Sequence, residues 1–413
     1  MAEKELSFAK NATYNTIGTL INGFCLWLTT LVVVRLSDDY ANAGVWQLAI
    51  SVTNIFATIA VFNLLTFYVS DVKEKYKTGE YLATQFITCV FAIALCVIYS
   101  LVCGYRSGQL LCIIAYMFCR AIESFEGILF GIDQRFCRMD YVGISYSMRG
   151  IFDIIVFTVI LYFTQNLTLS AVGMIATTAL ILIFYDIPKS KQFVELKIDF
   201  NKGDILNLLK ESALSVVSIA AITAINTIPR QFLENIYDEN NLGYFATIAA
   251  PLVVIQVVAV GIFNPILKDL AIAYDENDVK KLKSYALKIF LMLVTFAIIG
   301  LIGAKLFGTF LYTLIYGESI RPYCYLMYAL VGCTVMYAAC WAVFSMLVVM
   351  RKPFVMTIFS ILSVLSTVTF SSPLINKFFL NGTSYSILIA YAMFFVLGMA
   401  YILINLGNKK KDI

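Results

Sequence analysis

Residues 384–406 read SYSILIAYAMFFVLGMAYILINL, a run without a single Asp, Glu, Lys or Arg. A helix of about 20 apolar residues crosses the hydrocarbon core of a bilayer, so this run is long enough to span a membrane. The whole chain has the same character: 61% of its 413 residues are hydrophobic, 14% are charged, and the mean hydropathy is +0.84. A soluble domain cannot bury that much apolar surface, so the sequence predicts an all-α integral membrane protein.

We expect twelve transmembrane helices in two six-helix bundles around a central cleft. The longest loop divides the chain into an N-terminal bundle (1–186), a cytoplasmic linker (187–211) and a C-terminal bundle (212–413). The first apolar stretch is too long for a cleavable signal peptide. The twelve stretches are 13–36, 43–69, 81–104, 109–130, 144–164, 168–186, 212–235, 243–267, 285–308, 322–350, 353–374 and 384–406.

The distribution of basic residues predicts the orientation. With the N-terminus inside, 23 of the 30 Lys and Arg residues fall in cytoplasmic segments. This bias predicts that both termini are cytoplasmic. The outer loops are short and leave no room for an extracytoplasmic catalytic domain. The seven remaining basic residues are Arg35, Arg106, Arg120, Arg230, Lys305, Arg321 and Lys377.

The absence of histidine excludes several chemistries. A chain without His has no His-ligated metal site, Ser-His-Asp triad or imidazole relay, so proton or ion handling must fall to carboxylates. The ten cysteines include same-helix pairs seven residues apart, about 10 Å along a helix, which is too far for a disulfide. We interpret the cysteines as small apolar residues at helix contacts. We expect no catalytic residues, metal or cofactor, and no nucleic-acid partner.

The two halves are weakly similar to each other. Each has an arginine at the outer end of its first helix, a glycine that opens its second helix, and a Phe-Asn pair late in that helix. Six spans per repeat give both halves the same orientation, related by a pseudo-two-fold axis along the membrane normal. This symmetry predicts a cleft flanked by helices 1, 2, 7 and 8. The matching positions are Arg35, Gly44 and Phe62-Asn63, and Arg230, Gly243 and Phe263-Asn264.

The fourth apolar stretch carries three charges, Arg120, Glu123 and Glu126. A charged side chain at the centre of a membrane costs about 2.5–3.5 kcal/mol on insertion scales, so each needs a reason. Arg120 and Glu123 are three residues apart and can pair on one helix face, which leaves Glu126 to find a partner on another helix. Three charges within two turns indicate a hydrated cavity.

Two further pairs, Arg149–Asp153 and Arg230–Glu234, have the i, i+4 spacing of helical ion pairs. Such pairs can be purely structural or can reach the interface. The planar guanidinium of arginine suits phosphate and carboxylate, so Arg35, Arg120 and Arg230 could attract an anionic ligand. Glu123, Glu126 and Glu234 could equally neutralise these arginines.

Polar stripes mark two helices as candidates for the cleft. In the seventh stretch Asn226, Arg230 and Glu234 recur every four residues beside Thr223, and Pro229 removes a backbone hydrogen bond. In the first stretch Asn15, Asn22 and Thr29 recur every seven residues. Helices with such faces should line water rather than lipid.

Several segments resemble bacterial polysaccharide flippases of the Wzx type. They are NTIPRQFLENIYDENNLGYFATIAAPLVV (226–254), NATYNTIGTLINGFCLWLTTLVVVRLSDDYANAGVWQLAISV (11–52) and FLYTLIYGESI (310–320). Arg230 matches the arginine of the family's PR segment and Arg35 matches its helix 1 arginine, whereas Arg120 and Glu123 match no motif. A thirteenth or fourteenth helix is absent.

The resemblance implies the fold of the MOP superfamily, which also contains multidrug (MATE) exporters and lipid II flippases. It implies a V-shaped cleft, alternating access, and outward flipping of undecaprenyl-pyrophosphate-linked oligosaccharide repeat units, with membrane lipid, a glycan polymerase and a chain-length regulator as partners. Candidates for the substrate cleft are Arg35, Arg120, Arg230, Asn22, Thr223 and Asn226. Candidates for coupling to H⁺ or Na⁺ are Glu123, Glu126, Asp153 and Glu234.

Three alternatives remain open. A MATE-like exporter of cationic compounds would need carboxylates, rather than arginines, to dominate the cleft. A membrane glycan polymerase, ligase or glycosyltransferase could use Asp38 and Asp39 in the first outer loop, although short outer loops argue against an enzyme. A major facilitator carrier should show a Gly…Asp-Arg…Gly pattern in the loop that here reads SDVKEKYKTGEY (70–81).

Overall fold

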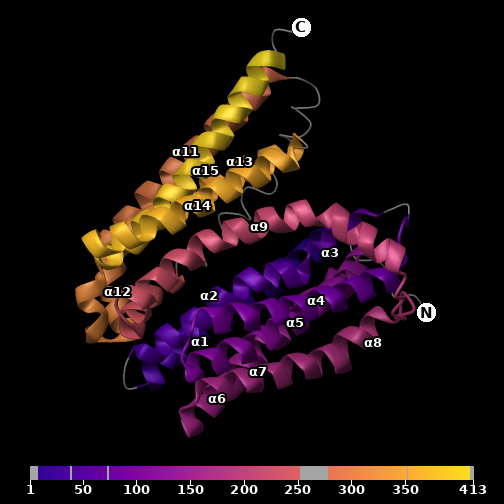
Figure 1. The fold of residues 1–413 in the computed structure, drawn as a ribbon, viewed down its shortest axis with the longest axis horizontal. Helices are drawn as coiled ribbons and strands as arrows, with labels where there is room; N and C mark the ends of the chain where they lie inside the picture. The colour runs from indigo at the N-terminus through magenta and orange to yellow at the C-terminus, as the bar shows by residue number, and fades with distance from the viewer. Residues whose placement is uncertain (1–7, 38–39, 72–73, 252–277, 351, 410–413) are drawn as a thin grey trace. The chain divides into compact units, whose positions relative to one another are not determined.

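A computed structural model describes residues 8–37, 40–71, 74–251, 278–350 and 352–409, and these ranges form helices joined by short loops (Figure 1). Among them, ten helices are long and apolar enough to cross a membrane. The prediction of an all-α, multi-pass membrane protein is therefore confirmed. The number twelve and the arrangement as two six-helix bundles stay predictions.

Two expected spans lie outside these ten helices, for different reasons. The stretch 109–130 does form a long helix, α5 (Ser107–Arg135), but Arg120, Glu123 and Glu126 make it less apolar than the others. Of the stretch 243–267, only the first part is described, where residues 239–251 are helical. The rest of that stretch lies outside the described residues.

The chain divides into two compact units, Met1–Val216 and Val217–Ile413. The boundary falls inside one helix, α9 (Lys202–Ile236). The predicted linker 187–211 contains helical structure at both ends, in α8 (Ile187–Ser190) and in the start of α9. The predicted domain boundaries stay a prediction.

The N-terminal unit is a bundle in which α1 packs along α6, α2 against α4 and α5, and α7 against both α5 and α6 (Figure 1). Its helices follow the apolar stretches of the sequence closely. They are α1 (Phe8–Leu36), α2 (Ala41–Val61), α3 (Leu64–Ser70), α4 (Thr78–Val102), α5, α6 (Met139–Thr164) and α7 (Leu167–Ile181).

The pair Phe62-Asn63 interrupts the second predicted span and separates α2 from α3. Both residues have positive φ, 47° and 56°, in the left-handed region that a non-glycine residue rarely adopts. The sequence comparison of the two halves singled out this pair. Its counterpart, Phe263-Asn264, lies outside the described residues.

Glycines allow α1 and α6 to cross at backbone contact. A Cβ on Gly143 would lie 2.2 Å from the carbonyl oxygen of Tyr14, and a Cβ on Gly18 would lie 2.3 Å from that of Gly143. One heptad further along α6, a Cβ on Gly150 would lie 2.9 Å from the Cα of Asn22. Small residues give membrane helices this close approach, which here brings the polar stripe of α1 directly over α6.

The sixth predicted span ends in a short π-helix. α7 continues through η1 (Leu182–Asp186) into α8 without a loop. A π-helical turn shifts the register of the following side chains and is common at functional sites. Here the π-helical turn ends at Asp186, whose side chain is buried in the N-terminal unit.

One end of the N-terminal unit is closed by residues 191–201, which run over the start of α4. The amide of Asp199 donates to the carbonyl of Gly79 at 3.0 Å, and a Cβ on Gly79 would meet the carbonyl of Lys197 at 2.3 Å. Beside this contact, Lys75 Nζ donates to Glu211 at 2.6 Å. The Glu211 carboxylate holds the pKa of the Lys75 ammonium above its ordinary value.

The C-terminal unit packs α14 against α15 and α13 against both α15 and α11. Hydroxyl groups line the seam between α14 and α15, where Ser371 and Ser386 share a hydrogen bond of 2.8 Å. Such small polar contacts are common between membrane helices. The elements after α9 are α11 (Val279–Gly303), η2 (Ala304–Gly308), α12 (Thr309–Tyr316), η3 (Glu318–Tyr323), α13 (Leu326–Val349), α14 (Pro353–Phe378) and α15 (Leu380–Lys409).

Eight of the ten cysteines are buried as the sequence indicates, whereas Cys103 and Cys137 are exposed and are not helix-contact residues. All ten are free. Cys333 and Cys340, seven residues apart on α13, donate to backbone carbonyls of Ser384 and Tyr391 on α15 at 3.2 and 3.0 Å. They are helix-contact residues, as expected.

Candidate functional site

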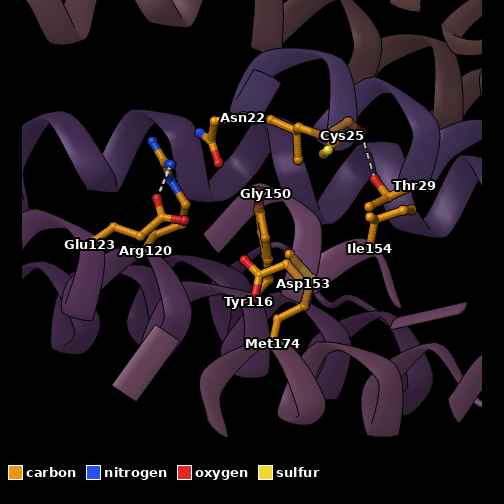
Figure 2. A pocket seen from close by; sticks show the side chains of 11 residues that line it. Asn22, Cys25, Thr29, Tyr116, Arg120, Glu123, Gly150, Asp153, Ile154 and Met174 are labelled. Carbon is orange, nitrogen blue, oxygen red and sulfur yellow. Dashed lines mark hydrogen bonds and ion pairs between the residues drawn. The ribbon is translucent and has the colours of Figure 1, made fainter. Parts of the chain in front are cut away.

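The N-terminal unit contains a small polar cavity between α1, α5, α6 and α7 (Figure 2). Its volume is about 30 Å³. Four residues that the sequence singled out, Asn22, Arg120, Glu123 and Asp153, meet there from three different helices. The complete lining is Asn22, Cys25, Leu26, Thr29, Tyr116, Arg120, Glu123, Gly150, Asp153, Ile154 and Met174.

The expected pairing on α5 is confirmed. Arg120 Nη1 donates to Glu123 Oε2 one turn further along the helix, as the dashed line in Figure 2 shows. The pair faces the cavity, and only 28% and 13% of the two side chains is exposed. Arg120 therefore presents a neutralised guanidinium rather than a free cation.

Arg149 has partners other than the one its spacing suggests. Its Nη1 donates to Glu126 Oε2 at 2.7 Å, and its Nε lies 3.8 Å from Glu123 Oε1. The expected pair with Asp153 is not formed; Asp153 instead accepts a hydrogen bond from Thr177 on α7. The physical reason is that α5 offers Arg149 two carboxylates across the helix interface. Glu126 thereby gains the interhelical partner that the sequence left open.

These contacts make one buried network of two guanidiniums and three carboxyls. Cys119 Sγ, Glu123 and Asp153 could offer three ligand atoms within 4.8 Å of one another, a spacing that would suit a metal ion. Glu123 is already shared by Arg120 and Arg149, however, and two adjacent positive charges repel a cation. The arrangement suits a proton better than a metal ion.

The volume of the cavity limits what it can hold. A site for a drug-sized ligand needs roughly 300–1,000 Å³, whereas one water needs only about 10–15 Å³ of comparable volume. At about 30 Å³ the cavity holds water or a single small ion and excludes a sugar ring. The cavity can thus store or pass a proton, and a glycan would need a different surface.

The polar stripe of α1 reaches this cavity in part. Asn22 faces the cavity above Gly150 (Figure 2). Thr29 also lines the cavity and accepts a hydrogen bond of 3.1 Å from Trp46 Nε1. Arg35 does not take part. It lies at the end of α1 and is exposed.

The stripe of α9 lies in the C-terminal unit and forms a separate group. Asn226 Nδ2 donates to the hydroxyl of Tyr391 at 2.6 Å, and the Arg230 guanidinium lies 6.0 Å from the ring centroid of Phe245. Thr223 donates to the carbonyl of Ile219 in its own helix at 3.0 Å. Glu234 lies one turn beyond Arg230, and α9 continues through Pro229.

Sequence reasoning missed several residues of the cavity. Tyr116 could have been found, because it lies one turn before Arg120 on the same face of α5. Gly150 gave no signal of its own, and neither did Thr177, which does not line the cavity but donates to Asp153, because a threonine or a glycine in an apolar helix is common. Their roles depend on which helices become neighbours.

No protein-family model matches the chain. Among curated proteins, the chain is 23% identical over 316 residues to the capsular polysaccharide biosynthesis protein CapF of Staphylococcus aureus, covering 75% of this chain and 78% of CapF.

Two solved structures of MOP superfamily transporters and one of a lipid II flippase have a similar fold. An inward-facing multidrug resistance MATE transporter is 14% identical, with a TM-score of 0.70 over 100% of this chain and 97% of its own. The lipid II flippase MurJ in an inward closed conformation is 13% identical, with a TM-score of 0.69 over 94% and 87%. A MOP transporter from Pyrococcus furiosus, described as having a binding pocket of reverse polarity, is 14% identical, with a TM-score of 0.61 over 97% and 96%. The expected resemblance to this superfamily is confirmed at the level of the fold.

Proposed function

We propose that this protein is a flippase that moves undecaprenyl-pyrophosphate-linked oligosaccharide repeat units from the inner to the outer leaflet of a bacterial plasma membrane. The observation that carries the proposal is the combination of a fold shared with a lipid II flippase and sequence similarity to a capsular polysaccharide biosynthesis protein. By their printed names, one of these proteins flips lipid II and the other takes part in capsular polysaccharide biosynthesis. On this proposal both termini are cytoplasmic, and a glycan polymerase and a chain-length regulator are downstream partners.

The physical task is to carry a pyrophosphate and a polar glycan across hydrocarbon. Arg35 and Arg230 are the proposed phosphate contacts, because the guanidinium binds phosphate oxygens in a bidentate way. Thr223 and Asn226 are the proposed contacts to sugar hydroxyls, whereas Asn22 faces the small cavity and is a weaker candidate than the sequence indicated. Arg120 is a weaker candidate than the sequence indicated, since Glu123 neutralises it.

We assign the buried carboxyls of the N-terminal unit to ion coupling. Glu123, Glu126 and Asp153 lie in or beside the cavity, whose size suits water or a small ion. Glu234 belongs to the C-terminal stripe and is the remaining candidate. The two arginines beside Glu123 favour H⁺ over Na⁺ as the coupled ion.

The test uses the full chain in proteoliposomes that contain an undecaprenyl-pyrophosphate-linked oligosaccharide. We expect the glycan to become accessible to an external glycosidase faster than in protein-free liposomes. Arg230→Gln should slow this appearance, whereas Arg321→Gln, a change at an exposed arginine paired with Glu318, should leave it unchanged. Equal rates with and without the protein would contradict the proposal.

A MATE-like exporter remains the second candidate, favoured by the similarity to multidrug MATE structures and by the carboxyl-rich cavity. Cells that express the chain should then survive cationic dyes better than cells without it. Dye resistance without glycan movement would replace the flippase proposal with this one.

A further inference from the structure

One face of α5 carries acidic residues from the middle of the helix to its end. Glu123, Glu126 and Asp133 follow at spacings of three and seven residues, which place them on one face over about 15 Å of helix. Glu126 is 0% exposed and Asp133 is 1% exposed. The cavity accounts for Glu123 alone, so the other two need a separate explanation.

Two other helices add carboxyls to this face. Asp153 of α6 lies within 4.8 Å of Glu123, measured between their ligand atoms. Asp186, in the π-helical turn after α7, interacts electrostatically with Glu126, Asp133 and the neighbouring Arg149. Ser190, which donates to Asp133, lies one turn after Asp186 in the same helical run, so the carboxyls follow one another in the order Asp153, Glu123, Glu126, Asp186 and Asp133; we call this series the file.

The file has more carboxyls than cations to balance them. Five carboxyls, all of them 13% exposed or less, face Arg120, Arg149 and Arg138 among the described residues, and Arg138 is already paired with Asp140. Removing an unpaired charge from water is expensive, and a buried acid avoids that cost by taking up a proton. We therefore expect the surplus carboxyls to be protonated at neutral pH.

Two atoms of the file show where protons can reside. Glu126 Oε1 is fully covered and has no hydrogen-bond partner within the described part of the chain, and Asp186 Oδ2 is also fully covered, with the Ser145 hydroxyl as the polar group that faces the Asp186 carboxyl. Their residues are 0% and 2% exposed. Glu126 is faced by Arg149 and Tyr146 of α6 and by Glu123 and Asp186, and Asp186 is also faced by Tyr185.

The file leads to one end of the bundle. Ser190 Oγ donates to Asp133 Oδ1 at 3.1 Å, and Asp133 also interacts with Arg138 and Asp140 at the start of α6. Arg138 and Asp140 are joined by two hydrogen bonds of 2.9 Å. The basic residues Arg135 and Arg138 mark this end as the cytoplasmic side predicted from the charge bias.

We propose that Asp133 and Asp186 form the cytoplasmic entrance of a proton pathway that runs through Glu126 and Glu123 to Asp153 at the cavity. In each step one carboxyl releases a proton to the neighbouring carboxylate, and no other bond changes. The inference deepens the proposed function, because it supplies the coupling proton from within the N-terminal unit. The pathway itself needs no glycan substrate.

The test is infrared spectroscopy of the full chain in proteoliposomes without any glycan lipid. At neutral pH the wild type should show absorption from protonated carboxyl groups, which shifts in D₂O. Asp186→Asn should remove part of this absorption, and Asp133→Asn should leave the rest while slowing its exchange with D₂O several-fold. Asp204→Asn, at the exposed start of α9, is the matched control and should change neither property.

Three results would overturn the pathway: no protonated carboxyl absorption at neutral pH, absorption that survives Asp186→Asn unchanged, or exchange that Asp133→Asn does not slow. If Asp186→Asn does not fold, Ser190→Ala replaces it as the test. Loss of the hydrogen bond from Ser190 should then shift the infrared absorption of the Asp133 carboxyl. Because no substrate is present, these results are independent of the flipping assay. A chain that flips glycan lipid but lacks the absorption would retain the proposed function and lose the pathway.

Discussion

Arg149 holds the buried charges of the N-terminal unit together. It is 4% exposed, it donates to Glu126, and it lies beside Glu123. A buried ion pair adds little net stability compared with apolar residues of the same size, but removing one partner leaves an uncompensated charge in a dry site. Single and double substitutions at this pair should therefore differ sharply.

We expect Arg149→Met to lower the free energy of unfolding by about 3 kcal/mol, because it strips Glu126 of its partner. The double variant Arg149→Met with Glu126→Gln should recover part of that loss. The measurement is unfolding in mixed micelles followed by circular dichroism. As a control, Arg321→Met breaks an exposed pair and should change stability by less than about 1 kcal/mol. Equal effects of the two arginine substitutions would contradict the role given to Arg149.

The role of Asp153 can be tested through the energy source for transport. Asp153→Asn keeps the size of the side chain and its contact with Thr177 but cannot take up a proton. We expect the variant to flip glycan lipid at the same rate with and without an imposed pH gradient, whereas the wild type should respond to the gradient. A gradient-dependent Asp153→Asn variant would remove this residue from the coupling machinery.

At the scale of elements, the site depends on the crossing of α1 and α6. The glycines of that crossing let Asn22 and Thr29 reach the cavity opposite Arg120 and Asp153. Periodicity predicted both helices, but periodicity does not say which helices touch. The contact follows from the shape of the two backbones.

We expect Gly143→Ala to destabilise the protein by about 1–3 kcal/mol, since the new Cβ would press on the carbonyl of Tyr14 and push α1 away from α6. Gly127→Ala is the matched control, because a Cβ there meets nothing within 4 Å and alanine is the better helix former. The measurement is the free energy of unfolding of each variant, compared with that of the wild type. If Gly143→Ala is as stable as Gly127→Ala, the crossing is looser than described.

The loop over α4 offers a second test at this scale. A Cβ at Gly79 would collide with the carbonyl of Lys197, so Gly79→Ala should release residues 191–201. We expect faster trypsin cleavage at Lys191 and Lys197 in the variant than in the wild type. Gly203→Ala, where the nearest atom is 3.7 Å away, should leave the cleavage rate unchanged.

At the scale of the whole molecule, two cysteines report the orientation. Cys103 and Cys137 are exposed and the other eight cysteines are buried. Cys103 follows α4 and Cys137 follows α5, so the two lie at opposite ends of the bundle. Buried thiols react poorly, which makes this pair a natural probe of sidedness.

We expect a membrane-impermeant maleimide to label intact cells at Cys103 and not at Cys137, because the charge bias places the start of α6 inside. Labelling should disappear in Cys103→Ser and persist in Cys137→Ser. Permeabilised cells serve as the control, since both sites should then react. Loss of labelling in Cys137→Ser alone would reverse the predicted orientation.

Much of the helical layout could be predicted from composition alone. The apolar stretches coincide with the described helices to within a few residues at most ends, because hydrocarbon demands that each spanning segment satisfy its own backbone hydrogen bonds. The largest error is at the start of α9, which begins at Lys202 rather than near residue 212. The charged residues Lys202, Asp204, Lys210 and Glu211 lower the hydropathy of this first part of the helix, although a helix tolerates them.

The site could be predicted only in part. The sequence by itself determined that the protein is a multi-pass helical membrane protein, that Arg120 pairs with Glu123, and that carboxylates must handle any protons, because each of these follows from composition or from spacing within one helix. Only the tertiary structure decided that Arg149 pairs with Glu126 instead of Asp153, that Tyr116 lines the cavity, that Thr177 donates to Asp153, and that Asp186 lies near Asp133. Those contacts cross between helices, and the neighbours of a helix are selected by packing, which no local pattern encodes.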